Sequence, residues 1–253
     1  NIMAVVLQVL CTKIGIVTER DLSQLCRREY PKKTSFTLWV LAEVAIIATD
    51  LAEVLGTAIG LNLLFHIPIL AGIIITAFDT LIILALHKSG RRTIETIIIS
   101  LVSIIAMSFL VELLIVKPDF GEVAYGFIPK LSDSGALYIA IGIIGATVMP
   151  HNLYLHSNIV INQIKMSKKD KMRYNKIDSI IALNLAFLVN SAILILAATT
   201  FHKNGYFGIE EIQDAYHLLE PLLGTKLAPA LFGVALLAAG QSSTITGTMS
   251  GQI

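Results

Sequence analysis

Long apolar stretches separated by short polar segments dominate the hydropathy pattern of this 253-residue chain. A membrane-spanning helix needs about 20 consecutive, mainly apolar residues, because each residue adds about 1.5 Å along a hydrocarbon layer about 30 Å thick. We therefore predict an all-α, polytopic membrane protein whose spans form a single transmembrane domain. Seven stretches approach the required length, at residues 1–18, 36–64, 68–87, 94–116, 136–160, 178–201 and 227–253.

Two of the polar segments between these spans have structural signals of their own. Segment 117–135 includes Pro118, Gly121, Gly126 and Pro129, so we expect an irregular external loop. Segment 202–226 includes EEIQDAYHLLEPLLG, whose apolar residues recur at helical spacing. We expect a short amphipathic helix there, ended by Pro221 and Gly224 and lying along the outer surface.

Composition and charge agree with a membrane protein. The chain is 55% hydrophobic and 15% charged, whereas soluble domains average about 25% charged residues. Its net charge of +1 gives no argument for a nucleic-acid partner. Lys and Arg gather in segments 19–35, 88–93 and 161–177, while the intervening segments hold few. Basic segments stay on the cytoplasmic side, so these three are predicted to be cytoplasmic and the lipid bilayer is a predicted partner.

The cysteines predict no disulfide bonds, and the start of the chain carries no recognisable processing signal. Cys11 and Cys26 give no disulfide framework. No signal peptide precedes the first apolar run, and the chain begins without Met and stops inside another apolar run. We interpret it as a fragment of a longer protein. Compact loops without Asn-x-Ser/Thr acceptors favour a bacterial plasma membrane.

The second span contains three acidic residues on one face. Asp50 lies about 20° from Glu43, and Glu53 lies about 60° further round, at about 100° per residue. Acids within a bilayer are costly, and three on one stripe cannot all be ionised cheaply, which is the chemistry of a proton relay. A structural polar seam, or a position near the interface, is the alternative. The isolated acids Asp79 and Glu112 are interpreted as packing contacts or helix-end positions.

The fifth span is predicted to be a broken helix. Pro150 lacks an amide donor and leaves the carbonyl of Ala146 without a helical partner. Gly145 weakens the preceding turn, and Thr147 is predicted to cap a new helix that starts at Pro150. A carbonyl from Ala146 and the thioether of Met149 would lie at the break, and oxygen with soft sulfur favours transition metals. A gap-filling methionine in the core is the alternative.

Two histidines follow the break. His151 and His156 are five residues apart, and HNLYLH lacks the Glu of the HExxH peptidase motif, so no enzyme is indicated. A buried histidine can change charge near neutral pH, which suits proton transfer. Structural and functional roles for His151 stay equally open on the sequence, and His156 is the weaker candidate.

The seventh span has a small polar face that includes Gly240, Gln241, Ser242 and Thr244. Such faces let helices approach closely and form hydrogen bonds across their interface. Helix packing is therefore the default interpretation, and the lining of an aqueous vestibule is a compatible functional one.

Taken together, these residues resemble the natural resistance-associated macrophage protein (Nramp) family of divalent metal transporters. The resemblance extends over the whole chain, and the MPHN-centred segment is highly specific. It rests on KIGIVTERDLSQLCR (13–27), ATDLAEVLGTAIGLNLLF (48–65), GATVMPHNLYLHS (145–157) and AAGQSSTITGTMSGQ (238–252).

The resemblance implies a LeuT-like fold, with this chain supplying helices two to eight. It implies proton-coupled uptake of Mn²⁺ or Fe²⁺, with Cd²⁺, Co²⁺ and similar ions accepted and no prosthetic group. Met149 matches the metal-binding methionine, Ala146 the carbonyl ligand and His151 the histidine associated with proton coupling. Asp50 and Glu53 match the acidic pair of the proton route. Glu43 matches an acid further along that helix.

One departure concerns the family's DPGN motif, whose Asp and Asn complete the metal site in the first helix. No DPGN occurs in this chain, which opens inside what matches helix two. We attribute the absence to truncation, so this chain is expected to hold half a metal site and not to transport ions by itself.

The sequence thus predicts a proton-coupled importer of divalent transition metals that works by alternating access. A LeuT-fold carrier of a small organic substrate is one alternative, and it requires no soft ligand at the break. A metal channel or sensor is another, and uphill accumulation driven by a proton gradient would exclude it.

Overall fold

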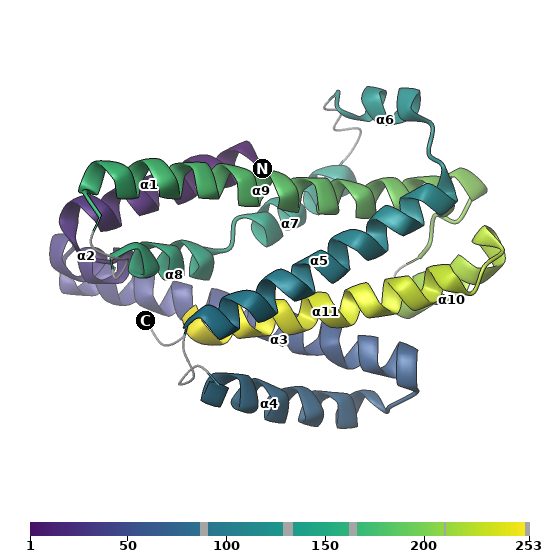
Figure 1. Ribbon diagram of the computed structural model, residues 1–253, viewed down its shortest axis with the longest axis horizontal. Coiled ribbons are helices and arrows are strands. Elements are labelled where there is room, and N and C mark those ends of the chain that lie inside the picture. Colours follow the sequence, from purple (N-terminus) through teal and green to yellow (C-terminus); the bar gives the residue numbers. More distant parts are fainter. Residues whose placement is uncertain (87–90, 129–133, 162–165, 210, 251–253) are drawn as a thin grey trace. The chain divides into compact units, whose positions relative to one another are not determined.

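All seven predicted spans are helical in the computed structural model (Figure 1), which describes residues 1–86, 91–128, 134–161, 166–209 and 211–250. Every regular element within those ranges is a helix. The spans correspond to α1 (Ile2–Thr18), α3 (Lys32–Phe65), α4 (Ile69–Leu86), α5 (Arg91–Val116), the pair α7 (Ser134–Thr147) and α8 (Pro150–Ile161), α9 (Lys168–Thr200) and α11 (Leu227–Ser250). Residues 88–90 and 162–165 of the predicted basic segments, and residues 87 and 251–253 of the predicted spans, lie outside the described residues.

Four shorter elements lie in segments that were expected to be loops or surface structure. These are α2 (Leu22–Glu29), α6 (Phe120–Gly126), the 3-10 helix η2 (His202–Asn204) and α10 (Ile212–Leu223). The expectation of an irregular loop is therefore wrong for residues 120–126 of segment 117–135, and the basic segment 19–35 also contains a helix. Aspartate caps explain both helices, since Asp21 accepts from the Gln24 amide and Asp119 from the Gly121 amide.

Two helix boundaries also differ from the predicted ones. Helix α9 begins ten residues before position 178, because Ser167 and Asp170 cap its first turn through reciprocal hydrogen bonds of 3.2 and 2.6 Å. The amphipathic helix α10 is present as predicted, but it continues through Pro221 and ends at Gly224. The left-handed conformation of Gly224 (φ 65°), which glycine adopts without steric cost, is what ends it.

Sharp corners follow α1, α3 and α5, each at a non-glycine residue with positive φ. Glu19, His66 and Lys117 have φ values of 56°, 56° and 48°, and their amides bond to the carbonyls four residues earlier. These left-handed caps end each helix within one residue. The chain bends by 72° between α1 and α2 and by 120° between α3 and α4.

The helices belong to two compact units. The first unit comprises Asn1–Thr49, Lys130–Phe187 and Thr246–Ile253, and the second comprises Asp50–Pro129 and Leu188–Ile245. Helices α3, α9 and α11 contribute residues to both. Within the first unit, α8 packs against α1 and α2.

The second unit has an apolar core between α5, α9 and α11. Its buried members are Ile105, Phe109, Ala192, Leu196, Ala235 and Ala238. Small residues bring α3 close to α4 and α11: a Cβ on Gly72 would lie 3.0 Å from the Ala58 backbone, and one on Gly60 would lie 3.0 Å from the Leu237 backbone. Close approach through small residues is typical of helix packing in membranes.

Much of the apolar surface is not covered by the rest of the chain. In the apolar windows of Gly135–Ile161 and Lys168–Asn204, 6% and 11% of the residues are buried. Exposing such surfaces to water would be unfavourable, at roughly 25 cal/mol per Å², whereas lipid chains solvate them. By length and composition, four helices of the described residues are able to cross a membrane, or up to six if each bent pair is one span. The count of seven crossings stays a prediction.

Candidate metal and proton site

The fifth span is broken where Pro150 predicts it. Helix α7 ends at Thr147, and α8 begins at Pro150 after two non-helical residues (Figure 1). The Val148 amide makes the last helical bond of α7, 2.9 Å from the Ile144 carbonyl oxygen. Proline has no N–H, so the carbonyl of Ala146 has no amide donor four residues further on. The predicted interruption of this span is therefore confirmed.

Thr147 has a different part in the break from the one expected, whereas the weakening of the turn by Gly145 stays a prediction. The Thr147 hydroxyl donates to the Ile143 carbonyl at 2.7 Å, so it belongs to the last turn of α7 and the predicted cap on α8 is wrong. This bond competes with capping because a threonine side chain reaches back to its own helix as readily as forward. A Cβ added at Gly145 would meet no heavy atom within 4 Å, so no close helix contact requires a glycine there.

Met149 lies between the two half-helices and is half-buried. Its sulfur accepts a hydrogen bond from the side-chain amide of Asn152, with 3.8 Å between Nδ2 and Sδ. This contact orients the thioether from within α8, and a sulfur has a second lone pair for another partner. Ala146 is exposed at the end of α7. The break thus presents one carbonyl oxygen and one oriented soft sulfur, which suit a transition-metal cation better than Ca²⁺ or Mg²⁺.

His151 is buried in α8, two residues after Met149. It is 1% exposed, and neither ring nitrogen has a hydrogen-bond partner among the described residues. Leaving a buried polar group unpaired costs roughly 1–3 kcal/mol, so such a group calls for an explanation beyond packing. His156 also has an unpartnered Nε2 but is less deeply buried. A part for either histidine in proton exchange stays a prediction.

The corner between α1 and α2 holds α8 in place. Asp21 is 2% exposed, and its carboxylate accepts from the Ser23 hydroxyl at 2.6 Å and from the Asn158 amide at 3.1 Å. The Leu22 amide donates to the Ser157 hydroxyl at 3.0 Å. Gly15 of α1 lies so close to α8 that a Cβ there would be 2.6 Å from the Ser157 carbonyl oxygen. The half-helix with His151 is therefore fixed to α1 and α2 over its second half.

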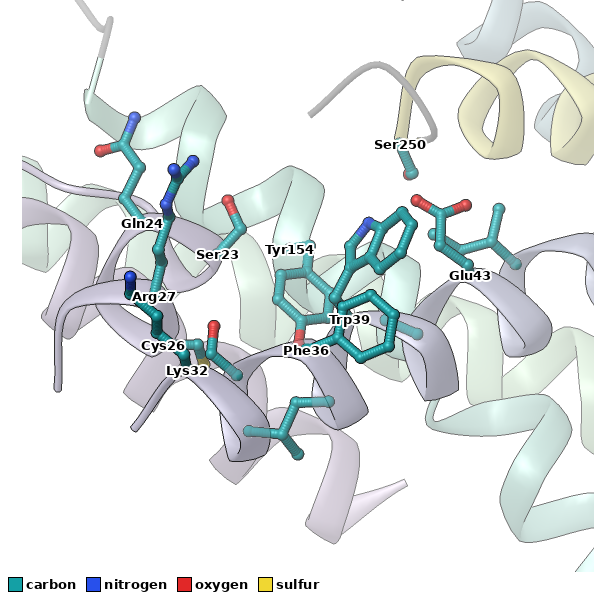
Figure 2. Close-up of a pocket in the computed structure, with 14 residues that line it drawn as sticks. Ser23, Gln24, Cys26, Arg27, Lys32, Phe36, Trp39, Glu43, Tyr154 and Ser250 are labelled. Carbon is teal, nitrogen blue, oxygen red and sulfur yellow. The ribbon is translucent and has the colours of Figure 1, made fainter. Parts of the chain in front are cut away.

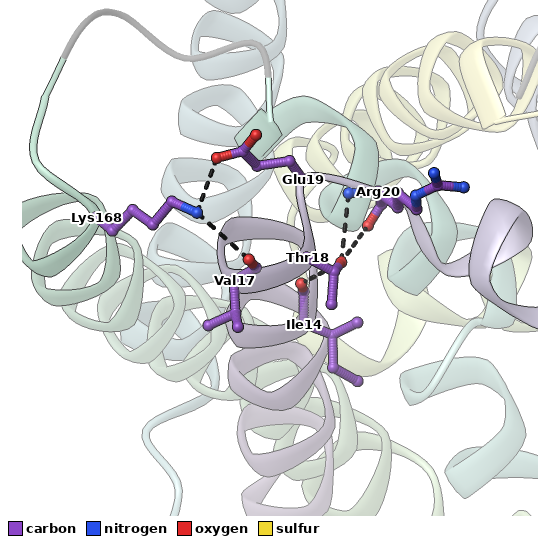
Figure 3. Close-up of polar contacts among 6 residues, drawn as sticks. All are labelled: Ile14, Val17, Thr18, Glu19, Arg20 and Lys168. Atoms are coloured by element: carbon purple, nitrogen blue, oxygen red, sulfur yellow. Dashed lines mark hydrogen bonds and ion pairs between the residues drawn. The ribbon is translucent and has the colours of Figure 1, made fainter.

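A second set of contacts ties α9 to the same corner (Figure 3). The Lys168 ammonium lies 2.8 Å from the Glu19 carboxylate and donates to the Val17 carbonyl at 3.4 Å. The Thr18 hydroxyl donates to the Ile14 carbonyl at 2.8 Å. The hydrogen bond and positive charge of Lys168 hold the pKa of Glu19 below the usual range, since both stabilise the carboxylate form. Polar groups at the end of α1 therefore make hydrogen bonds both within α1 and with Lys168 of α9.

The three acids of α3 fall into two environments. Glu43 lines a pocket of the first unit with Trp39 and Tyr154 (Figure 2). Asp50 and Glu53 begin the second unit, one helical turn apart on neighbouring positions of the same face. Asp50 Oδ1 and Glu53 Oε2 are buried without a hydrogen-bond partner among the described residues.

Glu112 is a residue that the sequence interpretation undervalued. It is completely buried in α5, and neither carboxylate oxygen has a partner among the described residues. Its position near the end of α5 agrees with the helix-end alternative, and its oxygens make no polar packing contact among the described residues. The available signal was its position four residues before the end of an apolar span, where an acid is costly. The contact of Asn152 with Met149 and the Asp21 corner were also missed, although Asn152 is only three residues from Met149. The partners of the Asp21 corner are set by packing between helices.

The polar face of α11 is engaged in packing. Gln241 donates from its side-chain amide to the Asp79 carboxylate of α4, which confirms the packing interpretation of Asp79. Ser242 and Thr244 donate to carbonyls of their own helix, those of Ala239 and Gly240. The vestibule role of Gln241, Ser242 and Thr244 stays a prediction.

Titratable and soft groups do not gather into a closed cluster. Among the described residues there is no group of three or more His, Cys, Asp or Glu side chains placed to hold a metal ion. The candidate ligands at the break are instead a carbonyl and a thioether, from α7 and the α7–α8 link. Met149, His151, His156 and Glu43 belong to the first unit, and the acidic pair belongs to the second.

Apolar helices of spanning length, one of them interrupted beside a buried unpartnered histidine, define a helical membrane protein with the architecture of secondary transporters. The family model described as "Natural resistance-associated macrophage protein-like" matches residues 1–253. The chain belongs to this Nramp family, as its motifs predict.

Relatives and solved structures agree with this assignment. The chain is 53% identical to the divalent metal cation transporter MntH of Brucella suis and 52% identical to that of a Nostoc species. These matches cover the whole chain and 57% and 59% of the relatives. The crystal structure of a variant of the Eremococcus coleocola manganese transporter has a TM-score of 0.87 and 38% identity, over 99% of this chain and 56% of that one.

The chain therefore spans little more than half the length of the relatives that it matches. The all-α fold and its LeuT-like architecture are confirmed by the structural match. The relatives are named as transporters, which confirms the prediction of a transporter family and not an enzyme family.

Proposed function

We propose that this chain serves in proton-coupled import of divalent transition-metal ions across the plasma membrane. The observation that supports this best is the α7–α8 break. It places the carbonyl of Ala146 and the oriented thioether of Met149 within five residues of His151, which is buried and unpartnered. A metal ligand and a proton-exchanging group on one interrupted helix provide a direct means of coupling the two ions.

Mn²⁺ is the first candidate for the transported ion. The relatives are named divalent metal cation transporters, and the matching solved structures are of a manganese transporter. Fe²⁺, Co²⁺ and Cd²⁺ are proposed as further substrates, because all accept sulfur together with oxygen. Further ligands would have to come from groups beyond Ala146 and Met149, since two ligands do not complete a coordination shell.

His151 and the acids of α3 are each proposed to take part in proton movement. Asp50 and Glu53 support this role through their buried, unpartnered oxygens, and Glu43 through its position on a pocket of the first unit. His156 is a weaker member of the route. Intramembrane ionisable residues of this kind mark ion paths in transporters.

Transport is proposed to follow alternating access within a single transmembrane domain. Interrupted helices support this mechanism, because helix bundles rock about a site formed at the break. The basic segments 19–35, 88–93 and 161–177 are proposed to face the cytoplasm, in keeping with their Lys and Arg content. Gln241, Ser242 and Thr244 are proposed to line a vestibule during part of this cycle.

Substituting Met149 by Ala tests the metal site in the full-length protein reconstituted into vesicles. The variant should bind and import Mn²⁺ and Cd²⁺ at least about tenfold more weakly, equivalent to ~1.4 kcal/mol, because only the soft interaction is lost. Any response to Ca²⁺ should change much less. Met107→Ala is the matched control, since Met107 is an exposed methionine of α5. Unchanged Mn²⁺ affinity in Met149→Ala would show that the sulfur is not a ligand.

Substituting His151 by Ala tests proton coupling. Proton flux that accompanies Mn²⁺ uptake should fall by more than the metal affinity, measured with a pH-sensitive dye and by calorimetry on the same preparation. His156→Ala should have a smaller effect, because His156 is less deeply buried. Wild-type proton flux in His151→Ala would remove this residue from the proposed route.

A further inference from the structure

A pocket of about 660 Å³ opens in the first unit, and neither Ala146 nor Met149 of the α7–α8 break lines it. It lies between α2 and the first turns of α3, with Tyr154 of α8 and Ser250 of α11 along one side. Figure 2 shows its lining side chains. Pockets of this volume accommodate small organic ligands. The proposed proton route uses only Glu43 at one end of this pocket, and neither the proposed metal site nor the polar corner at Asp21 accounts for the rest of it.

The charges of the pocket are divided between its two ends. Arg27 and Lys32, both exposed, lie at one end, and Glu43 lies at the other (Figure 2). An Arg and a Lys that converge on one cavity favour an anion, in particular a phosphate group, which accepts hydrogen bonds from both. A divalent cation entering at this end would be repelled.

The wall between the charged ends is apolar and aromatic. Phe36 and Trp39 are 62% and 56% exposed, and their ring centroids lie 5.6 Å apart. Tyr154 lies behind them (Figure 2). An exposed Trp beside Lys and Arg near the start of a spanning helix is typical of the membrane interface, where acyl chains meet headgroups. A soluble anion would leave this aromatic wall uncovered, whereas a lipid would cover it.

We propose that this pocket binds an anionic phospholipid. The headgroup phosphate lies between Arg27 and Lys32, and an acyl chain lies along Phe36 and Trp39. Basic pockets on the cytoplasmic side of membrane helices bind anionic lipid headgroups in this way. The assignment of the lipid to the inner leaflet rests on the proposed orientation, but binding itself does not.

Trp39 provides a direct measurement, because it is the only tryptophan of the chain. The full-length protein, with any tryptophan outside this chain replaced by phenylalanine, is reconstituted into phosphatidylcholine bilayers. A small fraction of the lipid has brominated acyl chains, since bromine quenches indole fluorescence on contact. Brominated phosphatidylglycerol should quench Trp39 more effectively than brominated phosphatidylcholine. The preference should fall roughly fivefold for each basic residue removed, and it should disappear in the double variant Arg27→Gln, Lys32→Gln.

The double variant Arg28→Gln, Lys33→Gln is the matched control. It removes the same charge from neighbouring exposed residues that do not line the pocket, and it should keep the preference. Equal loss in both variants would show general surface attraction and overturn the proposal. Loss of the wild-type preference on adding soluble glycerol phosphate, at the bulk concentration of the lipid, would show a free-phosphate site and also overturn it. This readout involves no metal and no proton, so its failure is distinct from failure of the proposed transport.

Discussion

Buried polar residues of this chain fall into two kinds that differ in their hydrogen bonds. Asp21 is almost fully buried and accepts from several donors, so its burial is compensated and its role is structural. His151 and Glu112 are equally buried, yet their side-chain polar atoms have no partner among the described residues. Uncompensated burial is unfavourable by about 1–3 kcal/mol for each group. The second kind of residue is therefore where packing alone does not explain the burial, and for His151 the proposed part in proton movement would explain it.

The ion pair between Glu19 and Lys168 gives a pH-dependent prediction at this scale. Because the pKa of Glu19 is lowered in the folded chain, the ion pair contributes its full share of folding stability above the usual Glu pKa of 4.5. Its contribution is lost as the pH falls through the lowered value. Lys168→Gln should therefore raise the pKa of Glu19 towards its usual value. Carbon NMR of labelled glutamate carboxyl groups in detergent micelles measures this pKa.

Lys169→Gln is the control for this titration, because Lys169 is a neighbouring exposed lysine that makes no ion pair with Glu19 in the described contacts. It should leave the Glu19 titration close to that of the wild type. The same Glu19 pKa in wild type and Lys168→Gln would contradict the ion pair.

Close contact between helices, and not hydropathy alone, holds the interrupted span in place. Half-helix α8 is fixed by the backbone approach at Gly15 and by the hydrogen bonds of Asp21, Ser157 and Asn158. Half-helix α7, by contrast, has few buried residues, and neither Gly142 nor Gly145 has a neighbour within 4 Å of a Cβ position. The two halves of one span therefore have unequal support within this chain.

Gly15→Ala tests whether close contact with α1 supports α8. The added Cβ would lie 2.6 Å from the Ser157 carbonyl oxygen and 3.0 Å from Val160 Cγ2. A backbone oxygen cannot rotate away, so α8 has to shift, and we expect a loss of about 1–3 kcal/mol in unfolding free energy. Urea or thermal unfolding in one detergent measures it.

Gly142→Ala is the matched control in α7. Its Cβ meets open space, and alanine is favoured over glycine within a helix by about 0.5–1 kcal/mol. The control should therefore unfold at the same or a higher denaturant concentration than the wild type. If Gly15→Ala behaved like Gly142→Ala, the close approach of α1 and α8 would be refuted.

At the scale of the whole molecule, the uncovered apolar surface requires a bilayer and the basic segments predict its orientation. A thiol-labelling experiment checks that orientation. Lys33→Cys and Gly126→Cys place single exposed thiols in segments predicted to face opposite sides. In intact cells, a membrane-impermeant maleimide should label Gly126→Cys and not Lys33→Cys, with the reverse in inside-out vesicles. Labelling of Lys33→Cys in intact cells would contradict the proposed orientation.

Cys26→Ser is the background for both variants, so that the introduced thiol is the reactive one. Burial raises the pKa of the Cys26 thiol, which lowers the reactive thiolate fraction and makes Cys26 a poor reporter. Cys11 is buried in α1 and should stay unlabelled. Labelling of the Cys26→Ser chain without an added cysteine would show that Cys11 is accessible.

The sequence by itself determined the helices, the break and the family. Apolar length predicts a spanning helix because backbone hydrogen bonds must close within the segment in lipid, and Pro150 predicts the break because it lacks a donor. Both effects are local in sequence, so no tertiary information is needed. The same locality explains the errors: caps such as Asp21 and Asp119 form helices in polar segments that composition alone describes as loops.

Only the tertiary structure decided which buried polar residues have hydrogen-bond partners among the described residues and which do not. Asp79 and Glu112 look alike as single acids in apolar spans, but Asp79 accepts from Gln241 and Glu112 has no partner among the described residues. Likewise, the orientation of α8 depends on Gly15 and Asp21, which lie more than a hundred residues earlier in the chain. Such contacts depend on how helices pack, and helix packing is set by shape complementarity between distant segments, which hydropathy and spacing do not encode.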